Sequence, residues 1–492
     1  MWSDKLLAAL MQKGYSADWP ARMKEAFDDL YGSSGGRYPA SAKPLVEVRA
    51  PERQGSNEDV GVPFAALIHP SNPKSGPYGG MSIAIFPGDD DSPSLLSFVV
   101  GTNGLAPDEA ILGRPGHARK VKAVCAWLNA KYGKKTLRAW AKQEPSRIDQ
   151  PIPDNTTAQF PQYARAFNRY GNVLYGIFVP DRDSALEALT AFLDLMFEER
   201  GVLPLAPFRE EAERITQEWF ECLLPEASEE NVLELLRTRR YVILQGPPGT
   251  GKTRMAQELM KNHYGGRGRT IQFHANTTYE DFVGGLAPLE GKGDLGFRFA
   301  PKKGHLIAAA EEAKKESTPY LLHIDEINRA DMSKVLGEAI FLLEADDKTP
   351  REIALSYDFG DPFKNQLSLP ENLHIVGTMN SADRSLAVVD VAVRRRFAFK
   401  KMWPQMAVVR NGGCKLMQRA FGDLVSIFVE HANDDSFDLM PGHSYFLEAD
   451  DAAARQRLKV TLEPLLEEYL AQGYVASFAE PLRSYLQWVD SL

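Results

Sequence analysis

The chain has 492 residues, 44% of them hydrophobic and 25% charged, a balance typical of folded globular proteins that excludes a disordered or collagen-like chain. Its 57 basic and 66 acidic residues give a net charge of −9, which excludes a globally basic nucleic-acid-binding protein and leaves only a local basic face for DNA. Three widely spaced cysteines argue against a disulfide framework, and the lack of a signal peptide or of an apolar run near the ~20 residues that span a bilayer predicts a cytoplasmic protein without a membrane contact.

The first part of the chain predicts an α+β domain. Apolar residues at helical spacing, and one basic stretch, predict helices over 4–11, 21–30, 115–142 and 185–200. Short β-rich runs between turn-forming residues predict strands over 63–69, 81–86, 95–102 and 172–179. We therefore expect residues 1–205 to form an N-terminal α+β domain that contacts a target or a partner.

After residue 205 strands and helices alternate, which predicts an α/β fold with a parallel sheet flanked by helices. Helices over 210–223 and 229–237 are expected to link it to the first domain. The last part of the chain is predominantly helical and is expected to form a small lid. The predicted domains are therefore 206–404 for the α/β part and 405–492 for the lid.

A glycine-rich motif between a strand and a helix predicts a phosphate-binding loop. The strand at 241–245 is followed by Gly246, Pro247, Pro248, Gly249, Thr250, Gly251, Lys252 and Thr253, which form a G-x-x-x-x-G-K-T pattern. Backbone N–H groups of such a loop face phosphate oxygens, Lys252 adds a point charge, and the Thr253 hydroxyl is a candidate Mg²⁺ ligand. These residues and the next one, Arg254, are the candidate nucleotide-binding residues.

Two later strands end in polar residues suited to hydrolysis. The strand at 320–324 leads into Asp325, a candidate Mg²⁺ ligand, and Glu326, a candidate general base that polarises the attacking water. The strand at 373–378 leads to Asn380, a candidate for orienting that water. A strand-end Asn also makes local turn bonds, so its role depends on what surrounds it.

The sequence motifs around these residues resemble those of the AAA+ motor subunit of McrB-type, modification-dependent (type IV) restriction systems. The resemblance rests on GPPGTGKT, QFHANTTYEDFVGG, DEINRADMSKVLGEAIFLLE and MNSADRSLAVVDVAVRRRFAF, and on the lid motif Gly442–Phe446 (GHSYF). The family's Met-Asn-Thr-Ala-Asp run here ends in Asp383 and has Ser381 in place of Thr. The similar region covers roughly 241–470.

The resemblance implies an AAA+ P-loop NTPase that forms a homo-oligomeric, usually hexameric, ring with active sites between subunits. It implies that Arg329, Arg395 and Arg396 act on a neighbour's nucleotide, that Asp390 steadies them, and that Asp383 belongs to the site. A trans arginine neutralises charge as the γ-phosphoryl group leaves. McrB-type proteins use GTP, so GTP or ATP with Mg²⁺ is expected, although no guanine-reading Asn-Lys-x-Asp motif is present.

The resemblance also implies a McrC-like nuclease subunit as partner. No nuclease is expected here, because the first 240 residues contain no (D/E)-x-K triplet and the later triplets lie inside the nucleotide-binding region. Residues 284–304 and 353–369 are each expected to form a hairpin. The N-terminal domain of such proteins often recognises DNA, which makes this chain a candidate component of antiviral defence.

One basic and aromatic stretch is the candidate DNA-binding face. It contains Arg114, His117, Arg119, Lys120, Lys122, Lys131, Lys134, Lys135, Arg138 and Lys142, with Trp127, Tyr132 and Trp140 between them. These are the residue types that neutralise phosphates and stack on bases. The alternative interpretation is an amphipathic helical pair with tryptophans in the core and lysines in solvent.

Two other functions compete with the motor of a restriction system. One is a MoxR-like AAA+ chaperone that remodels protein partners, and the other is a sensor that only assembles with nucleotide. The SADRS…RRRF run favours the restriction motor over the chaperone, and Lys252 and Glu326 argue against the sensor.

Overall fold

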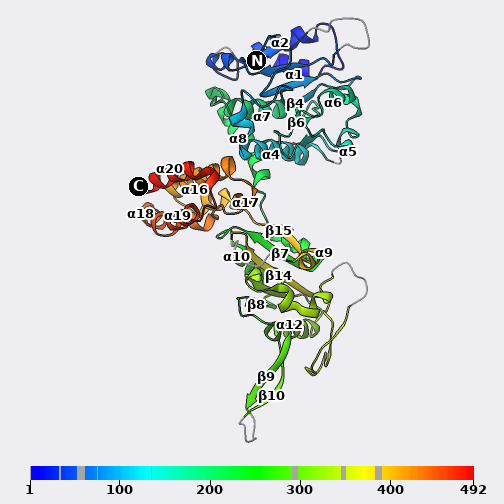
Figure 1. Cartoon of the computed structure of the whole chain (residues 1–492), viewed down its shortest axis with the longest axis vertical. Helices are drawn as coiled ribbons and strands as arrows, with labels where there is room; N and C mark the ends of the chain where they lie inside the picture. Colours follow the sequence, from blue (N-terminus) through cyan, green and yellow to red (C-terminus); the bar gives the residue numbers. More distant parts are fainter. Residues whose placement is uncertain are drawn as a thin grey trace. The chain divides into compact units, whose positions relative to one another are not determined.

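The computed structural model of the chain describes residues 2–32, 35–51, 61–74, 76–134, 136–290, 297–344, 351–382 and 390–492. The chain folds as two compact units (Figure 1). The first comprises Met1–Leu224 with Val429–Ala432, and the second comprises Pro225–Phe428 with Asn433–Leu492. Among the described residues no helix is long and apolar enough to cross a membrane.

An antiparallel sheet organises the first unit, with its described strands in the order β1-β2-β3-β4-β6-β5. Their bounds are β1 Glu47–Arg49, β2 Ala65–Ile68, β3 Met81–Phe86, β4 Leu95–Val100, β5 Ala139–Ala141 and β6 Leu174–Phe178. The helices are α1 Trp2–Leu10, α2 Trp19–Asp28, η1 Ala40–Leu45, α3 Glu109–Leu112, α4 Pro115–Tyr132, α5 Asp154–Thr157, η2 Pro161–Tyr163, α6 Ala164–Tyr170, α7 Ala185–Glu198, η3 Ala206–Phe208 and α8 Arg209–Leu223.

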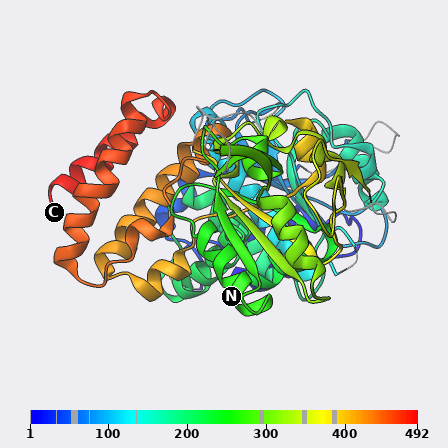
Figure 2. The same ribbon diagram turned by 90° about the horizontal axis from the view of Figure 1, so that it is seen from below.

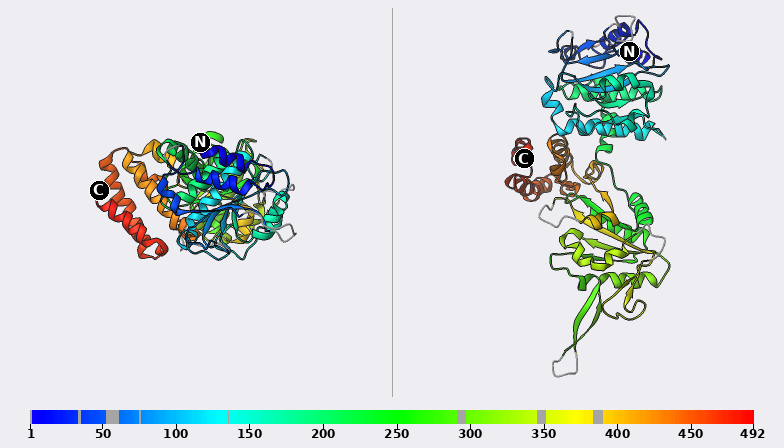
Figure 3. Two further views of the ribbon diagram at one scale, coloured as in Figure 1. Left: turned by 90° about the horizontal axis from the view of Figure 1, so that it is seen from above. Right: turned by 45° about the vertical axis from the view of Figure 1, so that its right-hand side comes forward.

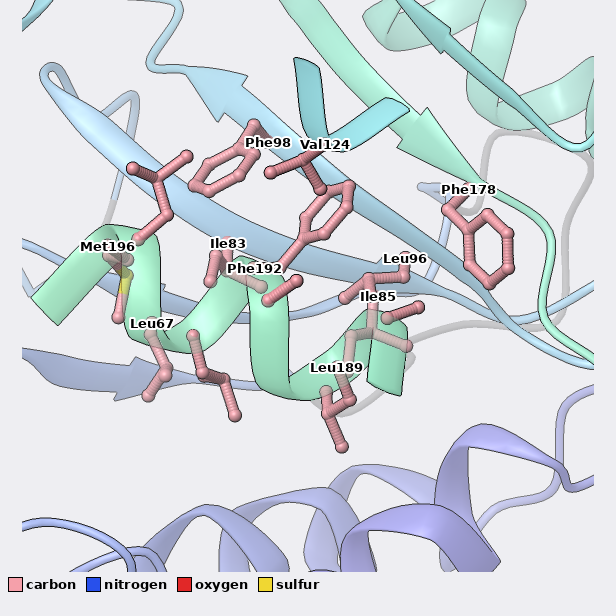
Figure 4. Close-up of a cluster of buried hydrophobic side chains, with 14 of the residues drawn as sticks. Leu67, Ile83, Ile85, Leu96, Phe98, Val124, Phe178, Leu189, Phe192 and Met196 are labelled. Carbon is pink, nitrogen blue, oxygen red and sulfur yellow. The ribbon is translucent and has the colours of Figure 1, made fainter. Parts of the chain in front are cut away.

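Both faces of the central strands β2, β3, β4 and β6 are buried, which explains why these strands are mostly apolar, whereas the edge strand β1 is partly exposed. Successive residues of β3 alternate between two cores, because side chains of a strand point to opposite faces. Ile83 and Ile85 belong to the core under α1, α2, α4 and α7, whereas Ala84 and Phe86 belong to the core under α6. Figure 4 shows the first core, in which α7 contributes Leu189, Phe192 and Met196 opposite Leu67, Ile83, Ile85, Leu96 and Phe98.

Two sequence predictions for this unit need correction. The stretch 115–142 is not helical throughout, because α4 ends at Tyr132, Gly133 follows it, and Trp140 lies in the short strand β5 beside β6. The helix at 210–223 is not a free link, because α8 buries Ile215 and Trp219 in the core of the first unit. The predicted domain boundaries at 205 and 404 stay predictions.

The second unit is built on a parallel sheet with its described strands in the order β15-β7-β14-β11-β8. The bounds are β7 Tyr241–Gly246, β8 Gly268–Gln272, β11 Tyr320–Asp325, β14 Leu373–Asn380 and β15 Ala398–Lys401. The helices around it are α9 Glu229–Arg239, α10 Lys252–His263, α11 Tyr279–Phe282, α12 His305–Lys314, η4 Ile327–Arg329, α13 Met332–Leu336, η5 Gly337–Leu342 and α14 Val391–Arg396.

Helices cover both faces of this sheet. Val242 and Leu244 pack under α9 and α10, and Tyr241 and Ile243 pack with α12 and α13 on the opposite face. Parallel strands buried on both sides are expected to be mostly apolar. The strands β7, β11 and β14 are so, apart from buried polar residues such as His323, His374 and Thr378. The predicted α/β fold is confirmed. Because β14 lies between β7 and β11, the carboxyl ends of these three strands meet at one edge, where open parallel sheets bind their ligands.

Both predicted hairpins are present. The first pairs β9 Gly284–Glu290 with β10 Phe297–Lys303 and extends from the parallel sheet as a two-stranded ribbon (Figure 3). The second pairs β12 Ile353–Ala354 with β13 Gln366–Leu367.

The chain after 405 is helical, as predicted. Figure 2 shows these helices in orange to red. They are α15 Met406–Gly412, α16 Lys415–His431, α17 Asp434–Phe437, η6 His443–Phe446, α18 Asp451–Arg457, the π-helical turn η7 Leu458–Leu462, α19 Glu463–Ala471, η8 Ala476–Phe478 and α20 Ala479–Asp490.

Candidate active site

The glycine-rich loop joins β7 to α10, as the sequence predicts. Gly249 and Gly251 have φ angles of +81° and +80°, a left-handed conformation that side chains disfavour, and Gly251 is the N-cap of α10. The first N–H groups of α10 have no carbonyl partner within the helix and carry the positive end of its dipole. The loop can therefore bind an anion such as a phosphate.

Lys252 lies inside this loop rather than in solvent. Its side chain is 7% exposed, and its Nζ donates hydrogen bonds to the carbonyl oxygens of Gly246 at 3.0 Å and Pro247 at 2.8 Å. Thr250 Oγ1 also donates to the Pro247 carbonyl, at 3.0 Å. Arg254, by contrast, has a 75% exposed side chain that pairs with Glu258. The lysine is thus held next to the backbone that would surround a phosphate.

Thr253 and Asp325, the two predicted metal ligands, are in direct contact. Thr253 Oγ1 donates a hydrogen bond to Asp325 Oδ1 at 2.9 Å, which joins the start of α10 to the end of β11. The hydroxyl of Thr378 on β14 donates to the same carboxylate oxygen. A hydroxyl and a carboxylate are hard oxygen ligands of the type that Mg²⁺ prefers, so this pair fits the ion that the sequence predicts.

Glu326 and Asn380 are also brought together. The Asn380 side-chain amide donates to Glu326 Oε1 at 2.7 Å, and Arg329 Nε lies 3.4 Å from Glu326 Oε2. Glu326 has a φ angle of +52°, an uncommon conformation for a residue other than glycine. Backbone strain of this kind occurs at functional sites, and the strained residue here carries the carboxylate that Asn380 contacts.

The other predicted interface residues lie on α14 and before it. The Asp390 carboxylate accepts a hydrogen bond from the Ala392 N–H at 3.1 Å, which caps α14, and a second one from the Ser333 hydroxyl at 2.9 Å. It therefore positions the helix that carries the arginines. Arg395 is exposed, whereas Arg396 is half-buried and donates to the Ala392 carbonyl at 2.9 Å. Asp383 lies outside the described residues.

The lid motif Gly442–Phe446 is bonded to the phosphate-binding loop. The backbone N–H of Gly442 donates to the Pro248 carbonyl at 2.9 Å, and that of Ser444 donates to the Gly249 carbonyl at 3.0 Å. A Cβ on Gly442 would lie 2.1 Å from the Gly249 carbonyl carbon. The sequence identified this motif, but nothing in it indicated these contacts.

His443 is the ionisable residue of this motif. Its Nδ1 accepts the Gln405 N–H at 3.2 Å, and burial together with the positive charge of Arg254 lowers the pKa of His443 to about 4. The imidazole is therefore neutral near pH 7, and its proton is on Nε2.

The basic and aromatic stretch of the first unit is largely neutralised by acids. Lys131 pairs with Glu187 at 2.6 Å and Glu218 at 2.8 Å, and Arg138 pairs with Asp181 at 2.9 Å. Trp127 is 4% exposed. These contacts favour the structural interpretation of this stretch; Lys135 lies outside the described residues.

Comparison with known proteins agrees with this geometry. Residues 241–397 match the family model described as "AAA domain (dynein-related subfamily)". The chain carries an AAA domain. The match spans β7 through the end of α14 and its cap, and so includes the phosphate-binding loop, Asp325, Glu326, Asn380 and the arginines.

Two relatives of the AAA domain belong to restriction enzymes. The chain is 35% identical over 296 residues to the type IV methyl-directed restriction enzyme EcoKMcrB subunit of Escherichia coli K12, covering 55% of this chain and 61% of that one. It is 27% identical over 197 residues to the type II restriction enzyme BsuMI component YdiS of Bacillus subtilis 168, covering 33% and 56%. The predicted resemblance to McrB-type AAA+ subunits is confirmed, although the chain spans little more than half the length of these relatives.

Among solved structures, PCH-2 of C. elegans matches at 14% identity over 54% of this chain and 64% of that one, with a TM-score of 0.22.

Proposed function

We propose that this chain is a Mg²⁺-dependent nucleoside triphosphatase and the ring-forming motor subunit of a McrBC-like restriction system. The observation that carries the proposal is the hydrogen bond from Asn380, at the end of β14, to Glu326, directly after β11, at the sheet edge where the phosphate-binding loop follows β7. An amide that holds a carboxylate next to a phosphate site can orient a water for attack on the γ-phosphate.

Each residue of the site has a distinct part in the proposed hydrolysis. The N–H groups of the loop and the Lys252 ammonium bind the β- and γ-phosphates. Thr253 and Asp325 would hold Mg²⁺, which neutralises charge on the phosphate oxygens. Glu326 accepts a proton from the attacking water, and Asn380 keeps the Glu326 carboxylate in the required orientation.

Arginines from a neighbouring subunit complete the proposed site. Arg395 is exposed on α14, and Arg329 on η4 has a side chain that is 47% exposed. Exposed arginines on an AAA domain suit a homo-oligomeric ring in which each subunit completes the site of the next. The resemblance to McrB-type proteins implies that this ring is a hexamer, and arginines that act in trans would make its activity depend on protein concentration.

The nucleotide and the partners follow from the resemblance to McrB-type proteins. We propose GTP as the preferred nucleotide, with ATP as the competing substrate. A McrC-like subunit is the proposed nuclease, and the first unit is the proposed DNA-recognition domain. The similarity to two components of restriction enzymes supports this assignment, and no observation favours the MoxR-like alternative.

The test is hydrolysis of GTP and ATP by the full-length chain and two variants. Lys252→Ala is expected to weaken nucleotide binding, whereas Glu326→Gln is expected to bind nucleotide, assemble and lose at least ~100-fold in kcat. Lys261→Ala, an exposed lysine on the same helix, is the matched control and is expected to behave as wild type. Hydrolysis by Glu326→Gln at the wild-type rate would contradict the proposal.

A further inference from the structure

Thr378 is a buried hydroxyl at the centre of the AAA domain. It lies on β14 two residues before Asn380 and is 2% exposed. Strand β14 pairs in parallel with β11, with Gly377 opposite Ile324, so the next residues along the two strands, Thr378 and Asp325, are neighbours. The resemblance to McrB-type proteins assigned Thr378 no role.

The Thr378 hydroxyl makes two hydrogen bonds, and both go to the acidic pair. It donates its proton to Asp325 Oδ1 and accepts the backbone N–H of Glu326 at 3.2 Å. A hydroxyl has one proton to donate and lone pairs to accept with, so the two bonds are compatible. One side chain therefore contacts the carboxylate of one acid and the peptide of the next.

Each of these bonds restrains one residue of the acidic pair. Asp325 Oδ1 receives a second hydroxyl from Thr253, so the carboxylate is oriented from α10 and from β14 together. The Glu326 peptide adopts the left-handed conformation with φ +52°, and its N–H is held by Thr378. Loss of the hydroxyl would leave the Asp325 carboxylate oriented from α10 alone, through Thr253, and would leave the Glu326 N–H without its bond to β14.

We propose that Thr378 is a positioning residue that fixes the Asp325 carboxylate and the Glu326 peptide for metal binding and water activation. The inference rests on the proposed nucleotide hydrolysis. Groups that hydrogen-bond a metal ligand set its orientation, and their loss typically costs 10–100-fold in metal affinity or activity. Thr378 acts through the two acids and not on the nucleotide itself.

A purely structural role makes a different prediction. Any buried hydroxyl needs hydrogen-bond partners, and its removal lowers the stability of the fold. Such a loss would not change how much Mg²⁺ the protein needs. The Mg²⁺ dependence therefore separates the two explanations.

The experiment compares Thr378→Val, which keeps the shape and removes the hydroxyl, with Thr378→Ser, which restores it. Thr378→Ala is a second hydroxyl deletion in case the valine variant folds poorly, and circular dichroism checks each fold. Thr270→Val on β8 is the control, because the Thr270 hydroxyl contacts the His323 ring at 3.2 Å and lies on a different strand. The full-length protein is assayed for kcat, for the Mg²⁺ concentration at half-maximal hydrolysis, and for GTP affinity with Mg²⁺ and with EDTA.

Thr378→Val is expected to lose about 10–100-fold in kcat and to need several-fold more Mg²⁺, with GTP affinity in EDTA unchanged. Thr378→Ser and Thr270→Val are expected to stay near wild type. A wild-type kcat and Mg²⁺ response in a folded Thr378→Val or Thr378→Ala protein would overturn the inference, as would equal impairment of Thr378→Ser. Glu326→Gln, assayed in parallel, tests the proposed hydrolysis separately. The difference between GTP affinity with Mg²⁺ and with EDTA reports on the role of Thr378 even if Glu326→Gln hydrolyses GTP normally.

Discussion

The backbone N–H of Ser444 in the lid motif donates a hydrogen bond to the carbonyl oxygen of Gly249 in the phosphate-binding loop, at 3.0 Å. A second bond of the same kind joins Gly442 to Pro248. The segment Gly442–Phe446 is thus attached to the phosphate-binding loop through backbone groups.

This attachment predicts a large effect of adding one methyl group. In Gly442→Ala the new Cβ would lie 2.1 Å from the Gly249 carbonyl carbon, far inside van der Waals contact, so the loop or the lid must move. We expect nucleotide affinity to fall at least ~10-fold, measured by calorimetry. Gly422→Ala is the control, because its Cβ would meet only the Met406 side chain, at 3.4 Å; its nucleotide affinity is expected to be unchanged. Equal affinities of the two variants would contradict the role of this contact.

Because His374 is buried, we expect the free energy of unfolding to fall at acidic pH. His374 is 8% exposed at the start of β14, and its Nδ1 is hydrogen-bonded to the Tyr264 hydroxyl at 2.6 Å. Burial, and then the charges of Arg240 and Arg237, lower the pKa of His374 to about 4. In the unfolded chain its pKa is about 6.5, so the unfolded state takes up a proton first as the pH falls.

The contribution of His374 to stability is therefore complete above pH ~6.5 and is lost as the pH falls from there toward 4. Between pH 7 and 5 the loss is of the order of 2 kcal/mol. Urea denaturation of the wild-type protein and of His374→Gln at pH 7.5, 6 and 5 measures this loss of unfolding free energy. The difference in unfolding free energy between the two proteins should shrink as the pH falls; a constant difference would show that His374 does not titrate in this way.

Because the arginines are proposed to act on the nucleotide of a neighbouring subunit, we expect two inactive variants to restore activity when they are mixed. Arg395→Ala removes the arginine that a subunit offers to its neighbour, and Glu326→Gln removes the base that it keeps. Each protein alone is expected to be inactive, whereas a mixture should recover part of the wild-type hydrolysis, because some interfaces combine an intact acid with an intact arginine. The measurement is hydrolysis against mixing ratio, with co-assembly checked by light scattering. No recovery at any ratio in co-assembled rings would argue against a shared site.

The sequence predicted the placement of candidate site residues where the signal lies in contiguous residues. The loop from Gly246 to Thr253, the strand ending at Asp325 and the strand ending at Asn380 each carry their signal locally, and the structure places them at one edge of the sheet. Contacts between distant segments gave no such signal. Neither Thr378, one hydroxyl in a buried strand, nor the bonds from Gly442 and Ser444 to the loop could be read from local pattern.

Contacts between distant segments also explain where the structure differs from the sequence predictions. The stretch with Lys131, Trp127 and Arg138 left a nucleic-acid face and a structural role both open, because its charges reveal nothing about acids elsewhere in the fold. Glu218 of α8 and Glu187 of α7 both pair with Lys131, which also ties the predicted linking helix α8 to α4 and α7. The strand β5 was missed because it has only three residues.

These ion pairs lead to a prediction about DNA. Lys131 has two carboxylates within 2.8 Å, so a phosphate would have to displace both before it gained a contact. We expect Lys131→Ser, in the full-length chain, to change DNA affinity less than ~2-fold. Unfolding should become slightly easier, because Glu187 and Glu218 lose Lys131 and keep Arg214 as the cation that pairs with both. Fluorescence anisotropy with modified and unmodified duplexes, at several salt concentrations, measures the affinity. A fall of more than ~10-fold, with the log–log salt slope reduced by about one unit, would instead mean that Lys131 leaves its acids to bind a phosphate, and the stretch 114–142 would again be the candidate DNA-binding face.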